Sequence, residues 1–494
     1  MFVEESIRDY KGNKMEIIRT IFWLFIFINS ILAFITVFRE RERDIAAIWA
    51  WLLVITMLPG IGIVLYLFLG RKISQENIFD IRSQKRIGMT QLVEAQKQLI
   101  ESENLDVPEA KHMDATLELV SLFLESNEAI LTKGNKVDII TDGKEKFDKL
   151  IEDIGKAEHH IHVTYYIFKA DGIGTRLLKA LEERAENGVE VKVLYDPIGA
   201  RVVGAHFFEH LKALGGKAEP FFGSKFFRLN YRNHRKIVVI DGKVGYTGGF
   251  NVGDDYLGLY EKMGYWRDTH LRINGNGVLP LQTRFLMDWN ASVKHHPVSY
   301  EESYFPVSSF IGSTDLQIVS SGPDTEMHAI KKGFLKMISM AKESVYIQTP
   351  YFIPDEALME TIKIASLSGI DVKLMIPNKP DHPFIYRATL SYAEEMINSG
   401  VKVYIYDAGF IHAKTIVIDG EILSVGTANF DIRSFKLNFE VNTFIYDRHL
   451  AKEQVAIFEK DMEASYELTR ELINQYSKWE LFKQQFSRLF SPIL

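Results

Sequence analysis

Cysteine is absent from this chain of 494 residues. Its absence excludes disulfide bonds, a thiol nucleophile, and zinc or iron–sulfur sites with cysteine ligands, although it identifies no cellular compartment. An excess of positive charge is also lacking, because the formal net charge is -7. The chain therefore has no overall cationic field that would attract nucleic acid, and we expect no nucleic-acid partner. Its length is sufficient for two or three domains.

Charge is missing from two long apolar segments near the N-terminus, residues 21–38 and 45–70. At about 1.5 Å per residue, helices of these lengths would span roughly 27 and 39 Å, and the hydrocarbon core of a bilayer is about 30 Å thick. A cleaved signal peptide is the alternative for the first segment. No clear small-residue cleavage site follows it, however, and the second segment begins almost at once.

The predicted transmembrane hairpin comprises residues 15–70, with helices at about 16–38 and 45–69, after a tail at residues 1–14. Membrane helices tolerate a kink, and we expect one at Pro59 and Gly60. Basic residues flank both outer ends of the hairpin. Three arginines lie in the connecting loop, so the excess of positive charge at the outer ends over the loop is reduced. Because positive charge is enriched on the cytoplasmic side, we expect both termini in the cytoplasm.

Beyond a charged, mostly helical linker at residues 71–133, the chain repeats itself. Short apolar runs alternate with amphipathic segments, which is typical of an α/β fold. The stretch "HHIHVTYYIF" at residues 159–168 resembles "ESVYIQTPYFIP" at residues 343–354, and further similar pairs follow. Such self-similarity indicates an internal duplication. We predict two halves, residues 134–315 and 316–494, the second ending in an amphipathic helix.

One motif occurs once in each half, as "NHRKIVVIDGKVGYTGGFN" at residues 233–251 and "IHAKTIVIDGEILSVGTANFD" at residues 411–431. Both copies contain a histidine, a lysine and an aspartate, followed by two small residues and an asparagine. The first copy has His234, Lys236, Asp241, Gly248, Gly249 and Asn251, and the second has His412, Lys414, Asp419, Gly426, Thr427 and Asn429. A lone His-x-Lys on a strand is usually a surface feature, whereas two complete copies indicate a catalytic site.

The residue types of this motif suit chemistry on a phosphodiester. Alternate side chains of a strand share a face, so each histidine lies beside its lysine, and the aspartate falls on the opposite face at an Asp-Gly turn. We therefore expect Asp241 and Asp419 to support the loop rather than to transfer protons. The lysines, the amides and the small residues are candidate ligands for phosphate oxygens. These candidates are Lys236, Lys414, Asn251, Asn429, Gly249 and Thr427.

Two copies of the motif supply what a single histidine lacks. One histidine attacks phosphorus, the other protonates the departing alkoxide and later activates the acceptor, and the lysines offset negative charge. We expect this chemistry to need no metal ion and no cofactor. The histidines within residues 159–162 could hint at a metal site, but no acid or further histidine completes a ligand set.

The paired motifs resemble those of the phospholipase D superfamily, and more closely those of the bacterial cardiolipin synthases. The stretches "HRKIVVIDGKVGYTGGFNVGDDYLG", "GYWRDTHLRI" and "IHAKTIVIDGEILSVGTANFDIRSFKLNFEVN" carry the resemblance, together with the N-terminal hairpin. It implies a duplicated phospholipase D-type fold, with two mixed β-sheets flanked by helices and an active site between the halves. It also implies a multi-pass protein of the bacterial plasma membrane whose catalytic body faces the cytoplasm.

The resemblance further implies the reaction. One phosphatidylglycerol gives its phosphatidyl group to a histidine, glycerol leaves, and a second phosphatidylglycerol accepts the group to form cardiolipin. The first-motif histidine of relatives is usually the nucleophile, which assigns that role to His234 and acid–base work to His412. The first copy departs from the common Gly-Ser pair and lacks a hydroxyl there. A phospholipase D that yields phosphatidic acid, a nuclease and an inactive scaffold are alternatives, and an oligomer is compatible with the sequence.

Two acids outside the motifs, Asp268 and Glu440, complete the expected site. Both lie in apolar stretches that are typical of strands, where a carboxylate is costly unless it is paired. A carboxylate at the corresponding place in the superfamily holds the far ring nitrogen of each motif histidine and fixes its tautomer. We expect Glu440 to serve His412 and, in the same way, Asp268 to serve His234. The alternative is a pair of surface acids on edge strands.

The C-terminal stretch carries apolar residues at helical spacing with basic residues between them. These apolar residues are Trp479, Phe482, Phe486, Leu489, Phe490 and Ile493. Two interpretations stay open, a helix that packs on the body and an interfacial helix that turns the site toward lipid.

Overall fold

The computed structural model describes residues 2–38, 45–66, 70, 89–102, 113–201, 203–222, 230–293, 295–299, 301–308, 311–379 and 381–491. The chain divides into an N-terminal unit, which includes residues 1–74, and a larger body that contains both copies of the motif. Ile493 of the predicted C-terminal helix lies outside the described residues.

The N-terminal unit contains the helices α1 (Phe2–Phe38), α2 (Ile45–Met57) and α3 (Ile61–Leu65). Within the described residues, α1 is the one helix long and apolar enough to cross a membrane. The kink expected at Pro59 and Gly60 is a break between α2 and α3, because Pro59 lacks an N–H and Gly60 has a positive φ of 82°. Residues 67–69 of the predicted second helix lie outside the described residues. α1 also begins earlier than the predicted residue 16.

Asn29 on α1 bridges to this interruption. Its Nδ2 donates to the carbonyl of Ile55 at 2.9 Å, and its Oδ1 accepts from the N–H of Gly60 at 3.1 Å. A helix end in apolar surroundings leaves backbone groups that water does not satisfy. The buried amide of Asn29 satisfies one group on each side of the break.

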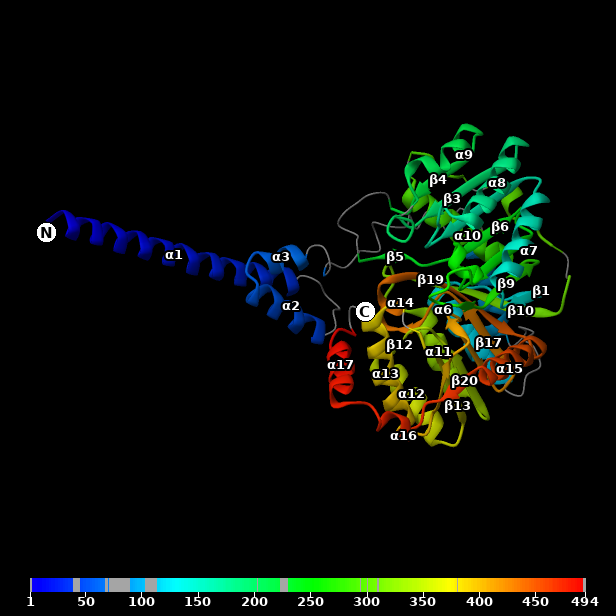
Figure 1. Ribbon diagram of the computed structural model, residues 1–494. Helices are drawn as coiled ribbons and strands as arrows, with labels where there is room; N and C mark the ends of the chain where they lie inside the picture. The colour runs from blue at the N-terminus through cyan, green and yellow to red at the C-terminus, as the bar shows by residue number, and fades with distance from the viewer. Residues whose placement is uncertain are drawn as a thin grey trace. The chain divides into compact units, whose positions relative to one another are not determined.

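The body is built on one mixed sheet of 16 strands that runs through both halves (Figure 1). The strands of the first half are β1 (Thr132–Ile140), β2 (His160–Tyr165), β3 (Glu190–Tyr195), β4 (Lys217–Pro220), β5 (Arg232–Asn233), β6 (Ile237–Ile240), β7 (Val244–Gly248), β8 (Tyr265–Arg267) and β9 (His270–Asn274). Those of the second half are β10 (Thr314–Ser321), β11 (Ser344–Gln348), β12 (Phe352–Ile353), β13 (Asp371–Pro377), β14 (Lys402–Tyr406), β15 (Gly409–Ile411), β16 (Thr415–Ile418), β17 (Ile422–Gly426), β18 (Phe430–Asp431), β19 (Asn438–Tyr446) and β20 (Ser465–Glu467).

The two halves join edge to edge, because β1 pairs antiparallel with β10. The two sheets that the resemblance implied are therefore two arms of a single sheet, which corrects that expectation. β8 with β15 and β12 with β18 form two small ladders beside it. Both small ladders belong to the surroundings of the motifs.

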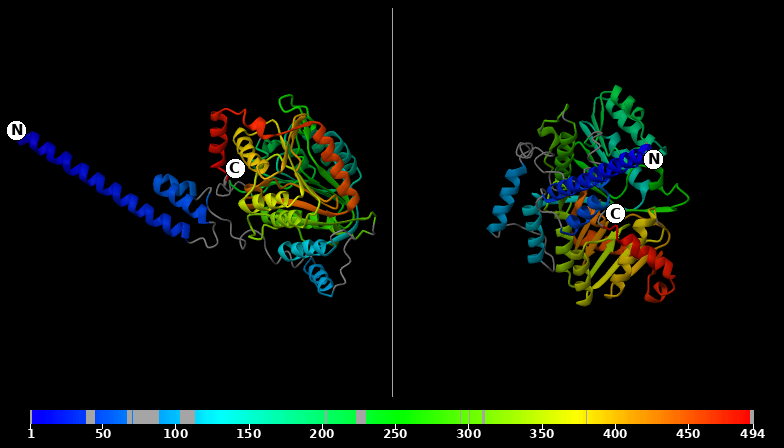
Figure 2. Two further views of the ribbon diagram at one scale, coloured as in Figure 1. Left: turned by 90° about the horizontal axis from the view of Figure 1, so that it is seen from below. Right: turned by 90° about the vertical axis from the view of Figure 1, so that its left-hand side faces the viewer.

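Helices cover both faces of the sheet (Figure 2). They are α5 (Met89–Glu101), α6 (Met113–Asn127), α7 (Gly143–Gly155), α8 (Gly172–Glu186), α9 (Glu209–Ala213), α10 (Val278–Ser292), α11 (Ala329–Met340), α12 (Glu356–Leu367), α13 (Pro383–Ile397), α14 (Ile432–Lys436), α15 (Arg448–Glu463), α16 (Arg470–Ile473) and α17 (Lys478–Arg488). β6 shows the consequence: Val238 and Ile240 pack with α7 and α8, whereas Ile237 and Val239 pack with α10. The strand after each motif lysine is thus buried on both sides, which explains its uninterrupted apolar run.

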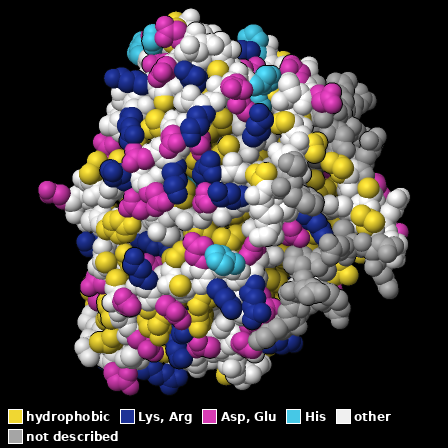
Figure 3. Space-filling model, turned by 90° about the vertical axis from the view of Figure 1, so that its right-hand side faces the viewer, with side chains coloured by type: hydrophobic (Ala, Val, Ile, Leu, Met, Phe, Trp, Pro, Cys, Tyr) yellow, Lys and Arg dark blue, Asp and Glu magenta, His cyan; other side chains and the backbone are white. Residues whose placement is uncertain are grey.

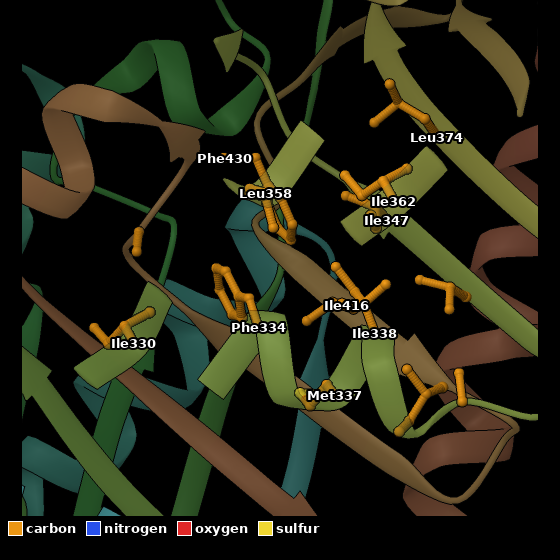
Figure 4. Close-up of a cluster of buried hydrophobic side chains, with 14 of the residues drawn as sticks. Ile330, Phe334, Met337, Ile338, Ile347, Leu358, Ile362, Leu374, Ile416 and Phe430 are labelled. Carbon is orange, nitrogen blue, oxygen red and sulfur yellow. The ribbon is translucent and has the colours of Figure 1, made fainter. Parts of the chain in front are cut away.

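A large apolar cluster in the second half fixes the sheet that carries the second motif. Phe334 and Ile338 on α11 and Ile362 on α12 face Ile347 and Ile416 on the sheet (Figure 4). Helix α6, within the predicted linker, also packs into this cluster through buried side chains of its own. The rigid packing holds the strand before and after the motif in one position.

Candidate active site

Each motif histidine follows a short strand that pairs with the other half of the body. β5 runs parallel to β19, and β15 runs parallel to β8. The backbone N–H of His234 then donates to the carbonyl of Phe439 at 2.9 Å, and that of His412 donates to the carbonyl of Arg267 at 2.7 Å. These pairings place each histidine against a strand from the opposite half.

The supporting carboxylates are therefore exchanged between the halves. Nδ1 of His234 lies 3.0 Å from Oε2 of Glu440, and Nδ1 of His412 lies 2.6 Å from Oδ2 of Asp268. The expectation that each acid serves the histidine of its own half was wrong. The reason is the strand pairing, because Glu440 comes from β19 beside β5, and Asp268 follows β8 beside β15. Both acids are fully buried, which excludes the surface alternative.

These contacts fix how the two imidazole rings are presented. A carboxylate accepts a hydrogen bond, so Nδ1 carries a proton in both His234 and His412, and Nε2 is the nitrogen that faces outward for chemistry. His234 shares its proton between Glu440 and the carbonyl of Thr427 at 3.1 Å. Two neutral rings with fixed tautomers are ready for a nucleophile and for an acid–base partner.

The two motif lysines are buried and bound in the same way. Nζ of Lys236 donates to the carbonyl of His234 at 2.7 Å, and Nζ of Lys414 donates to that of His412 at 2.5 Å. Burial lowers the pKa of Lys236 to about 7 and that of Lys414 to about 8. Lys414 also disfavours the charge of Lys236, and a bound phosphate anion would stabilise both cations.

Burial sets the protonation of the histidines as well. It lowers the pKa of His412 to about 3, with a further lowering by Lys414 and an opposing effect of Asp268. Burial also lowers the pKa of His234, against the opposing effect of Glu440. Although burial disfavours its charge, the pKa of Glu440 is lowered, because His234 and Lys236 stabilise the carboxylate. Both rings are neutral in the empty site near pH 7.

The motif aspartates lie at the turns, away from the histidines. The carboxylate of Asp241 accepts hydrogen bonds from the N–H groups that precede and begin β2, at 2.8 to 2.9 Å, and Asp419 does the same for β11. Asp241 and Asp419 have φ values of 53° and 54°, and the following glycines are also positive. Such turns match the twist of a hairpin. This is the geometry of a structural support, which the turn position predicted.

Thr427 and Gly249 occupy equivalent places with different contacts. Oγ1 of Thr427 donates to Oε2 of Glu440 at 2.5 Å, so its hydroxyl holds the acid instead of a phosphate. A Cβ at Gly249 would lie 1.8 Å from Oδ1 of Asp268. The absence of a side chain at Gly249 is therefore required by the closeness of Asp268, whose Oδ1 accepts from the N–H of Thr269.

The motif asparagines hold loops. Nδ2 of Asn251 donates to the hydroxyl of Tyr256 at 3.0 Å, and its Oδ1 accepts from the N–H of Ile167. Nδ2 of Asn429 donates to Oδ2 of Asp431 at 3.1 Å. Each amide thus uses one of its two N–H donors within the protein, and the expected role of the second donor as a phosphate ligand stays a prediction.

Aromatic rings beside the histidines were not singled out from the sequence. The ring of Tyr166 lies edge-on to His234 with centroids 4.9 Å apart, and Trp266 lies 5.3 Å from His412. Burial raises the pKa of Tyr166, so its hydroxyl stays protonated. Tyr166 directly follows β2 within the aromatic stretch "HVTYYIF", and Trp266 lies two residues before the buried acid in "WRDTH". These aromatic stretches are the signal that could have identified both residues.

The histidines at residues 159–162 have structural partners. His160 Nε2 lies 3.1 Å from Gln282 Oε1, and His162 Nδ1 and Nε2 contact Gln282 and Glu190. Among the described residues, no three histidine, aspartate or glutamate side chains are grouped so as to hold a metal ion. The cluster serves to tie β2 to α10.

Sequence comparison places this geometry in a family. The model described as "Cardiolipin synthase, PLD-like domain" matches residues 150–266 and 334–462, and one described as "Phospholipase_D-nuclease N-terminal" matches residues 30–71. The cardiolipin synthase of Listeria monocytogenes is 52% identical over 95% of this chain and 98% of its own length. The chain belongs to the cardiolipin synthases of the phospholipase D superfamily. It is therefore a phosphatidyltransferase that acts on phospholipids in association with a membrane.

Further relatives agree. The major cardiolipin synthase of Bacillus subtilis is 50% identical over 95% of this chain and 98% of its own length, and the cardiolipin synthase of Staphylococcus aureus is 50% identical over 97% of both. The crystal structure of phosphatidylserine synthase from Haemophilus influenzae aligns with a TM-score of 0.58 over 78% of this chain and 100% of that chain, at 17% identity. That structure supports the fold.

Proposed function

We propose that this cardiolipin synthase transfers the phosphatidyl group of one phosphatidylglycerol to a hydroxyl of a second, and that His234 carries the group in between. The observation that carries the proposal is the pair of exchanged contacts, His234 with Glu440 and His412 with Asp268. They bring two histidines of fixed tautomer and two buried lysines into one site. A phosphodiester with a poor leaving group requires these four functions.

In the first step, the phosphate oxygens lie against Lys236 and Lys414. The arriving anion favours the protonated forms of the buried lysines and of His412, because it supplies the missing countercharge. Nε2 of His234 attacks phosphorus, and the bond from phosphorus to the glycerol oxygen breaks. His412 gives the proton on Nε2 to that oxygen, and glycerol leaves. Glu440 stabilises the positive charge that His234 acquires.

In the second step, His412 is the neutral base. It takes the proton of the acceptor hydroxyl, whose oxygen attacks phosphorus while the bond to Nε2 of His234 breaks. Cardiolipin forms, His234 returns to its neutral state, and His412 holds the proton for the next cycle. Assignment of the nucleophile to the first motif rests on the resemblance to relatives, since the geometry of both rings is suited to attack.

Hydrolysis is the second candidate function, because water competes with the acceptor hydroxyl at the same intermediate. The purified full-length protein in phosphatidylglycerol micelles distinguishes the two by lipid chromatography. Cardiolipin with an equal amount of glycerol supports transfer. Phosphatidic acid as the main product would show that the enzyme is a phospholipase D.

We further propose that the reaction needs no metal ion, since histidines and lysines supply the nucleophile, the acid and the positive charge. Activity should be unchanged after chelation when the ionic strength is held constant. Loss of activity that one divalent ion restores would contradict this. Constant ionic strength is needed because cations also screen the anionic lipid.

We also propose that the N-terminal unit spans the plasma membrane twice and leaves the body in the cytoplasm. The apolar lengths of α1 and of the α2–α3 segment and the basic flanks support this. A reporter that is active only outside the membrane, fused after the last residue, should stay silent. An active reporter would reverse the orientation.

A further inference from the structure

Helix α17 is amphipathic, but its polar side faces the body and its apolar side faces outward. Its buried positions are polar, because Gln484 and Ser487 are 4% and 1% exposed and Ser491 just beyond the helix is 4% exposed. Its outward face is apolar, with Trp479, Phe482, Phe486, Leu489 and Phe490 between 37% and 74% exposed. A helix on the surface of a soluble protein normally turns its apolar face inward. The helix does pack on the body, against α13, as one interpretation of the sequence held, but it does so mainly through its polar side.

The exposed side chains form one ordered row, which we name the aromatic ridge. Ring centroids along it lie 5.3 Å apart for Trp479 and Phe482, 6.2 Å for Phe482 and Phe486, and 5.4 Å for Phe486 and Phe490. Phe384 at the start of α13 extends the ridge, 5.9 Å from Phe490. Contiguous exposed apolar patches mark interaction surfaces.

Polar anchors fix α17 in this orientation. Arg488 Nη2 donates to Glu395 at 2.6 Å, Gln485 donates to Ser391, and the hydroxyl of Tyr392 donates to Ser491. All of these partners lie on α13, beside which α17 runs in Figure 1. These hydrogen bonds require the polar residues of α17 to face the body. They therefore fix the orientation in which the aromatic ridge faces outward.

One end of the ridge is connected through the chain to a carboxylate that acts on a motif lysine. Phe384 lies three residues after Asp381, which accepts a hydrogen bond from the hydroxyl of Tyr351. The carboxylate of Asp381 lies close enough to Lys414 to offset part of the pKa lowering caused by burial.

We propose that the aromatic ridge inserts into the surface of the anionic phospholipid bilayer from which the enzyme takes its substrate. Aromatic side chains prefer the interface between water and hydrocarbon. Residues 478–488 carry three basic side chains and one acidic one. Lys483 pairs with Glu480 and Arg488 with Glu395, so these side chains together keep one net positive charge in a chain whose net charge is -7. By contrast, the side of the body seen in Figure 3 intersperses acidic and basic side chains. The proposal rests on the proposed function only in that the substrate is a bilayer lipid.

The absence of cysteine allows a direct test of depth. Leu489→Cys and Leu367→Cys place a single nitroxide label at two leucines that are both 74% exposed, the first on the ridge and the second at the end of α12. The full-length protein is placed in bilayer discs that contain phosphatidylglycerol. We expect the label at 489 to collide with oxygen and to be shielded from a water-soluble nickel chelate, and the label at 367 to meet the chelate freely.

Two outcomes would overturn the proposal. Equal access of the chelate to both labels would show that the ridge stays in water. A label at 489 that is shielded from both reagents and broadened by a second label, with relief on dilution by unlabelled protein, would show that a second copy covers the ridge. The depth measurement needs no turnover, so an inactive enzyme with a deep label would contradict the proposed function and leave the docking surface intact.

A kinetic test uses the double variant Phe482→Ser with Phe486→Ser and the control Leu367→Ser. The KM for phosphatidylglycerol in vesicles should rise about tenfold in the double variant, which is the change expected for loss of two interfacial anchors. Turnover of short-chain phosphatidylglycerol below its micellar concentration should be unchanged. An equal loss of activity on vesicle and on short-chain phosphatidylglycerol would show that the ridge acts by stabilising the body. An unchanged KM in vesicles would refute the role of the ridge in docking.

Discussion

The two copies of the catalytic motif share a backbone plan and differ in how each holds its acid. Both lysines bind the carbonyl of their own histidine, and both aspartates brace a turn. The copies differ in one matched pair: a short acid with no side chain opposite, Asp268 with Gly249, and a longer acid with a hydroxyl opposite, Glu440 with Thr427.

This difference shows that the residue at position 249 or 427 accommodates the carboxylate that holds a motif histidine. Asp268 has one methylene fewer than Glu440 and fills the space at Gly249, where its Oδ1 accepts a backbone N–H from Thr269. The longer side chain of Glu440 leaves room for Thr427, whose hydroxyl donates to it. The residue in that position adapts to the length of the carboxylate, so the copies tolerate different residues while each histidine keeps one carboxylate partner.

The largest effect is expected from the histidines themselves. His234→Ala and His412→Ala should each lower turnover by roughly 10^4-fold or more, because they remove the nucleophile and the acid. The variants should differ in one respect: a substrate with a good leaving group restores formation of the covalent intermediate in His412→Ala alone, since it needs no acid. Trapping of labelled phosphatidyl-enzyme measures this. The opposite pattern would exchange the two roles.

The next effect tests the exchange of acids between the halves. Glu440→Gln and Asp268→Asn keep shape and remove charge, and each should lower turnover by about 10^3-fold without unfolding the protein. Because Asp268 holds His412, a good leaving group should partly rescue Asp268→Asn and leave Glu440→Gln impaired. Rescue of Glu440→Gln instead would mean that each acid serves its own half in solution. Thermal melting of both variants is the control.

Substitution of the glycines isolates the difference between the copies. Gly249→Ala places a Cβ 1.8 Å from Asp268, which must move away from His412, and we expect a loss of turnover of about 10^2-fold. Gly426→Ala would place a Cβ 2.3 Å from the side chain of Asn442 and 2.5 Å from the backbone oxygen of Val441, so it should disturb β19 beside Glu440 and lower turnover as well. Gly155→Ala, with no neighbour within 4 Å, is the control. Equal activity of the variants at 249 and 155 would show that Asp268 can relocate without cost.

A smaller effect is expected from pH. Burial lowers the pKa of Lys236 to about 7 and that of Lys414 to about 8, so the empty site loses positive charge as pH rises through this range. An anionic lipid binds the charged form more tightly, and KM should therefore rise by about tenfold between pH 7 and 9. Lys236→Arg stays charged and should flatten the profile. A KM that falls over this range would contradict the assignment.

The smallest effect concerns the hydroxyl opposite Glu440. Thr427→Val removes one hydrogen bond to the carboxylate and should lower turnover by about tenfold, whereas Thr427→Ser should retain activity. The measured quantity is the rate of phosphatidyl-enzyme formation. A Thr427→Val variant that loses affinity for substrate without a change in that rate would show that the Thr427 hydroxyl binds the substrate phosphate, as the sequence predicted.

Local features could be read from the sequence, and pairings between distant strands could not. Spacing along one strand placed His234 beside Lys236 and put Asp241 at a turn, because alternation and the Asp-Gly signal act over a few residues. The partner of His234 is 206 residues away, and nothing in a single sequence says which strands lie side by side. Apolar periodicity likewise predicted α17 without revealing that its polar side is the buried one.

The membrane segments show the same limit. Uninterrupted apolar composition predicted a helix through residues 45–69, while the conformation of Gly60 ends it. Pro59 marked the place and was read as a kink, because composition does not say whether backbone groups freed by a proline find partners. Asn29, on the preceding helix, supplies one.

The pairing of each histidine with an acid of the opposite half has a consequence for synthesis of the chain on the ribosome. A ribosome makes the chain from its N-terminus, so His234 is synthesised 206 residues before Glu440. Asp268, the partner of His412, is synthesised before His412, but the rest of the second half is still missing when His412 is made. A nascent chain therefore has no finished His234–Glu440 pair until β19 is made.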